Sequence, residues 1–154
     1  MIVYRLADKQ YIEDKEGVGA KLFGGRWNNI NCPCIYASEH VSLAFIEKFV
    51  HAKVKENMLN IALLEIEIPD DDEQILHVKA DKMDISWKDN IAYTQWLGEQ
   101  ILDDISIVAF SVPSVLIPTE RNYILNPKSV HFNKVKYKKI TDFSTDYRLL
   151  NSLL

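Results

Sequence analysis

The segment Gly24-Gly25-Arg26-Trp27-Asn28 combines residue types that suit the binding of an anion. Adjacent glycines let a backbone adopt left-handed conformations and approach a ligand closely, and arginine offers a planar fork of donors that fits phosphate or carboxylate. The segment is not a P-loop, because the lysine and the following Ser or Thr are missing, and no G-x-G-x-x-G opens a helix. An ordinary turn with a surface arginine is the alternative interpretation.

Three further side chains could take part in chemistry, and each also has a purely structural interpretation. Glu47 stands in the apolar helical segment 43–49, where it could face a cleft or be exposed and pair with His51. Tyr36 lies on a short predicted strand, where an aromatic is commonly a core or edge residue. Ser114 follows a proline at the end of a predicted strand, where serine is commonly a turn residue. The residue types alone leave both interpretations open.

The histidines and cysteines match no catalytic or metal pattern that we recognise. The chain contains four histidines, at positions 40, 51, 77 and 131. His40 and His51 would share one helix face, but two histidines are a thin basis for a metal site. Cys32 and Cys34 are two residues apart, a spacing at which a disulfide would be strained. We therefore expect two reduced thiols and no metal.

The elements that must position these side chains mix strands with helices. Short β-branched and aliphatic runs predict strands at 2–6, 34–37, 59–68, 75–78, 105–110, 123–125 and 135–140. Apolar residues at helical spacing predict helices at 39–54 and 89–103. The order of elements lacks the regular βαβ alternation of a parallel doubly wound sheet. We predict an α+β fold with a mostly antiparallel sheet core and flanking helices.

Local signals add detail to this prediction. Ser38 is a plausible N-cap of the first helix. The polar, glycine-containing stretch 7–25 predicts a long loop, which in a compact domain is usually functional. A one-residue slip in the alternation at Leu63-Leu64 predicts a bulge, and residues 111–114 are expected to break the strand before them.

Length and charge exclude several classes of protein. A chain of 154 residues predicts one domain over 1–154. The net charge of −4 argues against a general electrostatic grip on DNA, RNA or anionic lipid. Uninterrupted apolar stretches stay well short of the roughly 20 residues that span a bilayer, and the N-terminus does not resemble a signal peptide. We expect a cytoplasmic protein that binds neither nucleic acid nor membrane.

Several segments, taken in order along the chain, resemble the RES domain, a family named for its Arg, Glu and Ser. The matching segments are Val3-Tyr4-Arg5-Leu6, Phe23-Gly24-Gly25-Arg26-Trp27-Asn28, Cys34-Ile35-Tyr36-Ala37-Ser38, Leu43-Ala44-Phe45-Ile46-Glu47, Thr94-Gln95-Trp96-Leu97-Gly98, Val112-Pro113-Ser114-Val115-Leu116-Ile117-Pro118, Asn122-Tyr123-Ile124-Leu125-Asn126-Pro127 and Asp146-Tyr147-Arg148-Leu149. The likeness covers nearly the whole chain. In one loop the family often has Gly-Thr-Pro, and this chain has Asn31-Cys32-Pro33 instead.

The resemblance implies a toxin of a bacterial toxin–antitoxin pair with a fold similar to that of ADP-ribosyltransferase toxins. Such a protein degrades NAD⁺ as its substrate, by phosphorolysis or hydrolysis of the nicotinamide–ribose bond, and needs no further cofactor. The implied partner is an Xre-family antitoxin, with a toxin homodimer plausible within the complex. The alternatives are an ADP-ribosyltransferase that modifies a protein and an inactive antitoxin-binding module. The acceptor, whether phosphate, water or a protein, stays open.

The resemblance also assigns roles to residues of this chain. The residues that correspond to the family's catalytic positions are Arg26, Tyr36, Glu47 and Ser114, and the expected NAD⁺-binding residues are Arg5, Gly25, Trp27, Asn28, Ser38 and Asn126. Arg5 and Arg26 suit the diphosphate, and Glu47 suits a ribose hydroxyl and the cation that develops in the transition state. Tyr36 could stack on nicotinamide, and Ser114 could hydrogen-bond nicotinamide or ribose.

Overall fold

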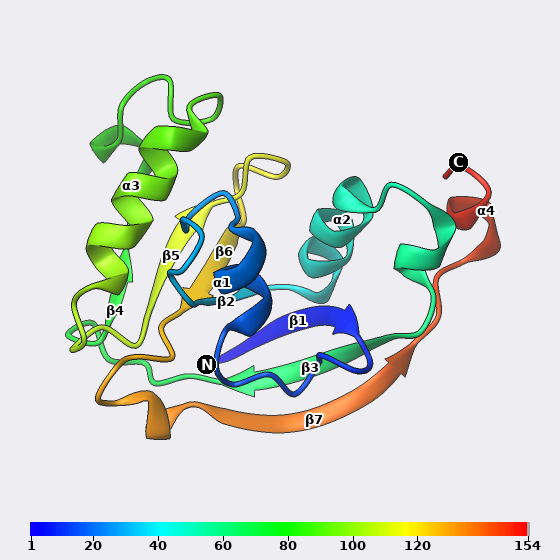
Figure 1. Cartoon of the computed structure of the whole chain (residues 1–154), viewed down its shortest axis with the longest axis horizontal. Coiled ribbons are helices and arrows are strands. Elements are labelled where there is room, and N and C mark those ends of the chain that lie inside the picture. The colour runs from blue at the N-terminus through cyan, green and yellow to red at the C-terminus, as the bar shows by residue number, and fades with distance from the viewer. Residues whose placement is uncertain (154) are drawn as a thin grey trace.

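The computed structural model describes residues 1–153, and in this part of the chain seven strands form one sheet in the order β4-β5-β6-β2-β1-β3-β7 (Figure 1). The strands are β1 (Ile2–Asp8), β2 (Ile35–Ser38), β3 (Ile61–Glu67), β4 (Ile75–His77), β5 (Ala109–Pro113), β6 (Arg121–Leu125) and β7 (Lys136–Phe143). The α-helices are α1 (Val18–Phe23), α2 (Val41–His51), α3 (Ile91–Leu102) and α4 (Tyr147–Leu150), and short 3₁₀ turns are η1 (Lys55–Met58), η2 (Ala80–Lys82) and η3 (Phe132–Lys134). The paired strands are antiparallel, except that β4 runs parallel to β5. The predicted α+β class with a mostly antiparallel sheet is confirmed.

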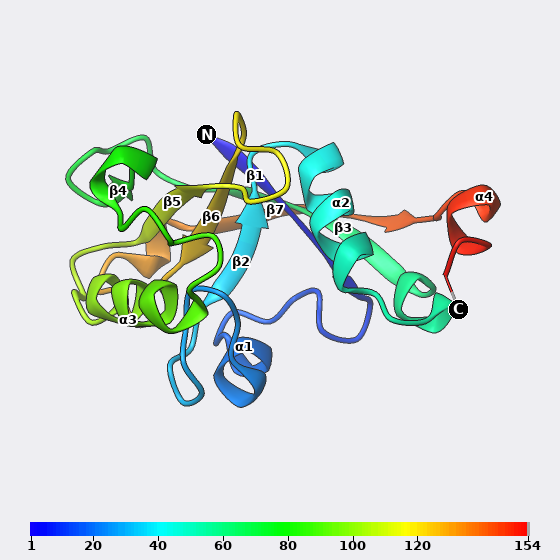
Figure 2. The same ribbon diagram turned by 90° about the horizontal axis from the view of Figure 1, so that it is seen from above.

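The sheet is nearly divided in two between β1 and β2. β1 pairs with β3 along its whole length, from Ile2 opposite Glu67 to Asp8 opposite Ile61. It pairs with β2 through a single register position, Tyr4 opposite Ser38. Seen from above, the two strands diverge from this point like the arms of a V (Figure 2). The divergence leaves an opening in the sheet that side chains or a ligand must fill.

Helices α2 and α3 cover the two halves of this divided sheet. Phe45 and Phe49 of α2 pack with Leu6 of β1 and Phe143 of β7. At the other end of the sheet, Leu102 of α3 belongs to a cluster that includes Phe110, Ile124 and Trp27. Strand alternation places the small and aliphatic residues Val3, Ile35, Ala37, Leu64 and Leu125 in a further cluster. Tyr36 and Ser38, which alternate with Ile35 and Ala37, therefore belong to the opposite face of β2.

Several local predictions differ from the structure. Ser38 does not cap the first helix, because it ends β2 and its hydroxyl bonds to Asn122; α2 begins at Val41 with His40 as its N-cap. The predicted loop 7–25 contains the end of β1 and the whole of α1. None of the residues of α1 is buried, so this short helix produces no apolar periodicity in the sequence.

The strand irregularities also lie elsewhere than the sequence predicts. The register of β3 against β7 shifts between Glu65 and Ile66, whereas Leu63 and Leu64 pair regularly. Residues 111–113 do not break a strand: they continue β5, because they pair with β6 through Pro113 opposite Arg121. β5 begins only at Ala109, so the predicted strand 105–110 was placed too early.

Candidate active site

A cavity of about 430 Å³ opens between the diverging strands β1 and β2. Its walls come from β1, the loop at 24–27, β2, one face of α2 and the end of β5. The structure brings seven of the predicted site residues to this cavity: Arg5, Gly25, Arg26, Trp27, Tyr36, Ser38 and Glu47. These residues come from four different parts of the sequence. They meet at one cavity because it opens where β1 diverges from β2.

One oxygen of the Glu47 carboxylate is fixed by two donors, one directly after β5 and one on β6. Ser114 Oγ donates a hydrogen bond of 2.7 Å to Glu47 Oε1, and Asn122 Nδ2 donates another of 2.7 Å to the same oxygen. Ser114 is fully buried, and its own Oγ accepts from the backbone N–H groups of Leu116 and Ile117. Within residues 1–153, Oε2 of Glu47 accepts no hydrogen bond, and its residue lines the cavity. Hydrogen bonds to Oε1 therefore fix the orientation of the carboxylate, and Oε2 is available to a ligand.

Ser114 thus lies behind Glu47 rather than on the cavity surface. The predicted contact of its hydroxyl with nicotinamide or ribose does not fit this placement, because the hydroxyl is occupied by Glu47 and the following turn. Its contribution is to hold the carboxylate. The predicted pairing of Glu47 with His51 also does not occur among the described residues, since both strong contacts of Glu47 run to Ser114 and Asn122.

The hydroxyl of Tyr36 links β2 to the loop at 24–28, which is called the arginine loop below by its residue Arg26. It donates to Asn28 Oδ1 at 2.7 Å and accepts from the backbone N–H of Trp27 at 3.0 Å. Burial raises the pKa of this phenol well above its usual value, and the nearby Cys34 adds to the rise. Tyr36 therefore stays neutral at physiological pH, and its ring forms a fixed wall of the cavity.

The glycines are required by the shape of this loop. Gly24 has φ 71°, a left-handed conformation that glycine adopts without strain, and the turn is closed by a 3.1 Å bond from Gly25 N–H to Asn28 O. A Cβ on Gly25 would lie 2.6 Å from the Tyr36 hydroxyl. At Asn31, where the family often has glycine, φ is 75°. Asparagine tolerates this conformation better than most residues, so the local backbone needs no glycine there.

Helix α3 holds the loop from behind. Thr94 Oγ1 donates to Arg26 O at 2.6 Å, and Gln95 Nε2 donates to Gly25 O at 2.9 Å. One turn later, Gly98 packs directly on the Trp27 backbone. The segment 94–98, whose function the sequence did not reveal, is therefore the support of the arginine loop.

Arg5 and Arg26 both line the cavity, but they differ in burial and in hydrogen bonding. Arg5 is on β1, and its Nε is buried with no hydrogen-bond partner within residues 1–153. Burial lowers the pKa of its guanidinium, partly offset by Tyr137 and Asp14. Arg26 instead donates from Nη1 to Lys88 O at 3.0 Å, on the exposed rim. A buried, unsatisfied cationic donor is costly, and Arg5 lines the cavity, where an anionic ligand would offset the charge of its guanidinium.

Sequence reasoning missed two basic residues and one amide of the cavity. Ala44, Glu47, Lys48 and His51 follow one another at helical spacing, so one face of α2 lines the cavity. Burial lowers the pKa of the Lys48 ammonium, and Arg5 lowers it further against the opposing effect of Asp8. The spacing of four residues from Glu47 to His51 was a signal available in the sequence, whereas Lys48 is four residues from Ala44 and directly follows Glu47. For Asn122, the sequence offered only its place in the segment 122–127 that resembles the RES domain, with no indication of a bond to Glu47.

Two predicted ligand-binding asparagines lie outside the cavity. Asn28 is fully buried, and its Nδ2 donates to the backbone carbonyls of Ala20 and Cys32. Asn126 is also fully buried, and its Nδ2 donates to the carbonyls of Leu102 and Ile107. Both amides hold backbone turns together, which explains their presence in the motif without contact to a ligand.

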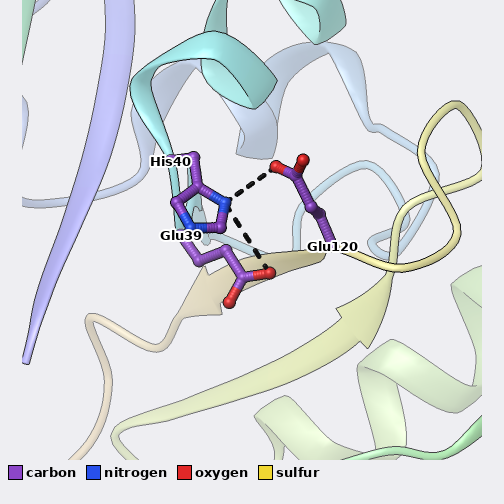
Figure 3. A group of neighbouring side chains, drawn as sticks. All are labelled: Glu39, His40 and Glu120. Carbon is purple, nitrogen blue, oxygen red and sulfur yellow. Dashed lines mark hydrogen bonds and ion pairs between the residues drawn. The ribbon is translucent and has the colours of Figure 1, made fainter.

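A second polar cluster, formed by residues that do not line the cavity, lies at the start of α2 (Figure 3). His40 Nδ1 is 2.8 Å from Glu120 Oε1 and 3.9 Å from Glu39 Oε1. The Glu39 oxygen also accepts from the backbone N–H of Arg121 at 2.8 Å. These bonds tie the start of α2 to the start of β6, and they account for the grouping without a metal ion.

Cys32 and Cys34 are both buried and free.

The cavity therefore combines one oriented carboxylate with a surplus of positive charge. Arg5, Arg26 and Lys48 are cationic, whereas Glu47 is its acidic residue. Such a site suits a ligand with several negative charges and one centre that becomes positive during reaction.

In the described part of the chain, no helix is both long enough and apolar enough to cross a membrane.

Comparisons with known proteins show the fold and the family of this chain. A toxin–antitoxin crystal structure, the MbcT–MbcA complex of M. tuberculosis, contains a chain that superposes with a TM-score of 0.74 and 18% identity, covering 99% of this chain and 87% of that one. This likeness confirms the predicted fold, similar to that of ADP-ribosyltransferase toxins. The RES domain model matches residues 2–147, and the chain belongs to the RES domain family.

Relatives of known name share this family. A protein called Toxin Res from Photorhabdus laumondii is 37% identical over 99% of both chains. A protein of the same name from Yersinia enterocolitica is 33% identical over 86% of this chain and 88% of its own. A protein from Sphingobium sp. called Prs ADP-ribosylating toxin is 30% identical over 90% of this chain and 88% of its own.

Proposed function

We propose that this protein is the toxin of a bacterial toxin–antitoxin pair and that it degrades NAD⁺ by breaking the nicotinamide–ribose bond. The observation that carries the proposal is the orientation of Glu47, whose Oε1 is held by Ser114 and Asn122 while Oε2 is left to a ligand. The surrounding cations and the RES relatives called toxins support it.

The chemistry requires little proton transfer. The bond between ribose C1′ and the pyridinium nitrogen breaks, its electron pair goes to the nitrogen, and neutral nicotinamide leaves. Positive charge develops at C1′ and the ring oxygen, and Glu47 stabilises it electrostatically in the transition state. Arg5 and Arg26 hold the diphosphate through charge-assisted hydrogen bonds. Because the leaving group is already cationic, no histidine is needed as a general acid.

The acceptor completes the reaction in one of two ways. Water adds its oxygen to C1′ and loses a proton, giving ADP-ribose, or phosphate adds an oxygen and gives ADP-ribose 1″-phosphate. Two or three electrostatic contacts of about 3 kcal/mol each would accelerate cleavage by about 10⁴- to 10⁶-fold. Lys48 and His51 add basic groups to the same cavity, which would favour a second anion.

One incubation tests the proposal. The purified protein is mixed with NAD⁺, with and without inorganic phosphate, and the products are identified by mass. We expect loss of NAD⁺ and release of nicotinamide, and we expect Glu47→Gln to lower the rate at least ~10²-fold with an unchanged circular dichroism spectrum. Glu56→Gln, in η1, serves as the matched control. Intact NAD⁺ with well-folded wild-type protein would overturn direct degradation and leave two alternatives, transfer to a protein and an inactive antitoxin-binding module.

A second candidate is ADP-ribosyl transfer to a protein. The Sphingobium relative called Prs ADP-ribosylating toxin favours it. In that case, NAD⁺ labelled in the adenylate part leaves label on a macromolecule, and free ADP-ribose or its phosphate is minor. The same incubation, repeated with a cell extract, separates this outcome from direct degradation.

An Xre-family antitoxin is the partner we propose, with a toxin homodimer within the complex. The fold neighbour from a toxin–antitoxin complex supports a protein partner. The rim beside the cavity supports it too, because Phe23, directly before Gly24, is 83% exposed and Leu22 is 59% exposed. An apolar contact of the antitoxin at these side chains is part of the proposal. Co-purification with the product of a neighbouring gene, and mass measurement of the complex, test the partner and the stoichiometry.

A further inference from the structure

Asn122 stands at the centre of a hydrogen-bonded relay that ends on Glu47. It lies on β6 directly opposite Ser38 of β2, and the two residues are register partners in the sheet. Ser38 Oγ donates to Asn122 Oδ1 at 2.7 Å, and Asn122 Nδ2 donates to Glu47 Oε1 at 2.7 Å. The Ser38 side is almost fully buried, with 4% of the residue exposed. The relay therefore runs from β2 through β6 to α2.

The relay sets the direction of the Asn122 amide. An amide carries an acceptor at one end and donors at the other. If the amide were turned over, its oxygen would face the Glu47 carboxylate and its N–H groups would face the hydroxyl of Ser38. The carboxylate needs a donor, so the observed direction is favoured, and the hydroxyl hydrogen of Ser38 secures it by bonding to Oδ1.

Two donors on one carboxylate oxygen determine how the other oxygen points. Ser114 and Asn122 approach Glu47 Oε1 from separate segments, the turn after β5 and the strand β6. Rotation of the carboxylate would break both charge-assisted bonds, which are stronger than neutral ones. With Ser114 alone, the group could pivot about a single bond. Asn122 thus supplies the second fixed point that directs Oε2.

We propose that Asn122 is a positioning residue: it aims the free oxygen of Glu47 at the reacting ribose, and Ser38 orients the Asn122 amide for this task. This inference rests on the proposed NAD⁺ cleavage. Asn122 itself lines the cavity, so direct binding of substrate by its amide is the competing interpretation. A positioning role changes kcat, whereas a binding role changes KM and substrate affinity.

The experiment compares Asn122→Ala, Asn122→Asp and Ser38→Ala with wild type. Rates are measured over a range of NAD⁺ concentrations, and affinity is measured by calorimetry with a non-cleavable carba analogue of NAD⁺. We expect Asn122→Ala to lower kcat about 10- to 100-fold, with KM and analogue affinity within about threefold of wild type. Ser38→Ala should lower kcat less, about 3- to 10-fold, because the amide keeps its bond to Glu47 and loses only the hydroxyl that holds its Oδ1.

Asn122→Asp separates positioning from simple packing. Aspartate has nearly the size of asparagine, so a side chain that only fills space would be replaced without loss. A positioning donor would instead be replaced by a carboxylate that repels Glu47, and we expect kcat to fall at least as far as in Asn122→Ala. Asn90→Ala, which removes the N-cap of α3, is the matched asparagine control: it should cost stability and leave kcat near wild type.

Contrary results have clear meanings. Unchanged kcat in Asn122→Ala and Asn122→Asp overturns the inference, and so does a loss confined to KM and analogue affinity. If wild type does not cleave NAD⁺, the proposed function fails, and the positioning geometry is then tested by a crystal structure of Asn122→Ala. A Glu47 carboxylate rotated or disordered relative to wild type supports the inference, and an unmoved one overturns it. The same structure decides the matter if Asn122→Asp does not fold.

Discussion

Gly98 of α3 lies against the backbone of Trp27, so closely that a Cβ at position 98 would be 1.8 Å from the Trp27 carbonyl oxygen. No side chain fits in this space, and the obstructing atom is backbone, which cannot rotate away. The contact brings α3 close enough for Thr94 and Gln95 to bond the carbonyls of Arg26 and Gly25. The helix and the arginine loop therefore form one rigid unit.

We expect Gly98→Ala to move helix α3 away from the loop that carries Arg26. We expect a loss of about 1–3 kcal/mol in the free energy of unfolding, as for overpacked sites, together with weaker NAD⁺ binding because Arg26 is displaced. Urea unfolding and calorimetry measure the two effects. Gly19→Ala in α1 is the control, because nothing lies within 4 Å of its Cβ position; the contact argument fails if both alanines have the same effect.

We expect Arg5→Met to weaken NAD⁺ binding without lowering the stability of the fold. Arg5 has a buried Nε without a partner in residues 1–153, so its charge contributes little to folding and is available to a ligand. We expect the Kd for NAD⁺ to rise about 10- to 100-fold, while stability stays equal or increases. Arg148→Met, which removes an exposed pair with Asp146, should change neither Kd nor turnover. A large drop in the melting temperature of Arg5→Met would show that the arginine is structural.

Tyr36→Phe removes the hydroxyl that joins β2 to the loop. The Trp27 N–H and the Asn28 oxygen then lose a partner, and we expect a loss of about 1–3 kcal/mol in unfolding free energy. Activity should fall as well, because the loop that carries Arg26 is no longer fixed. Tyr147→Phe, at a tyrosine that is 69% exposed, should leave stability within about 0.5 kcal/mol of wild type.

Alkaline pH should destabilise the protein. Burial raises the pKa of Cys34 and of Tyr137 to about 12, from ordinary values of 9.0 and 10.0. Both groups are neutral when protonated, so the folded state retains protons that the unfolded chain releases. Their contribution is fully present below pH 9 and is lost as pH rises from 9 to 12. Urea midpoints measured from pH 8 to 11 should decline, with a smaller decline in Cys34→Ala; a flat profile would contradict this burial.

The candidate site was predictable where its residues are carried by a local motif. Arg26, Tyr36 and Glu47 come from segments that resemble the RES domain, and the structure gathers them around one cavity. His51 could have been added from its helical spacing to Glu47, whereas Lys48 directly follows Glu47 and could not. Asn122 stands in such a segment as well, but its link to Glu47 was not visible, because the hydrogen bond joins residues 75 positions apart in the chain.

By itself, the sequence determined the class of fold and the family, because strand alternation, helical spacing and motif order are local properties that survive without a three-dimensional arrangement. Tertiary structure alone decided which side chains face the cavity. Ser114 and Asn126 stand in motifs as specific as that of Glu47, yet the first lies behind the carboxylate and the second holds a backbone turn. The physical reason is the divergence of β1 from β2 after a single paired position, which depends on packing across the whole sheet.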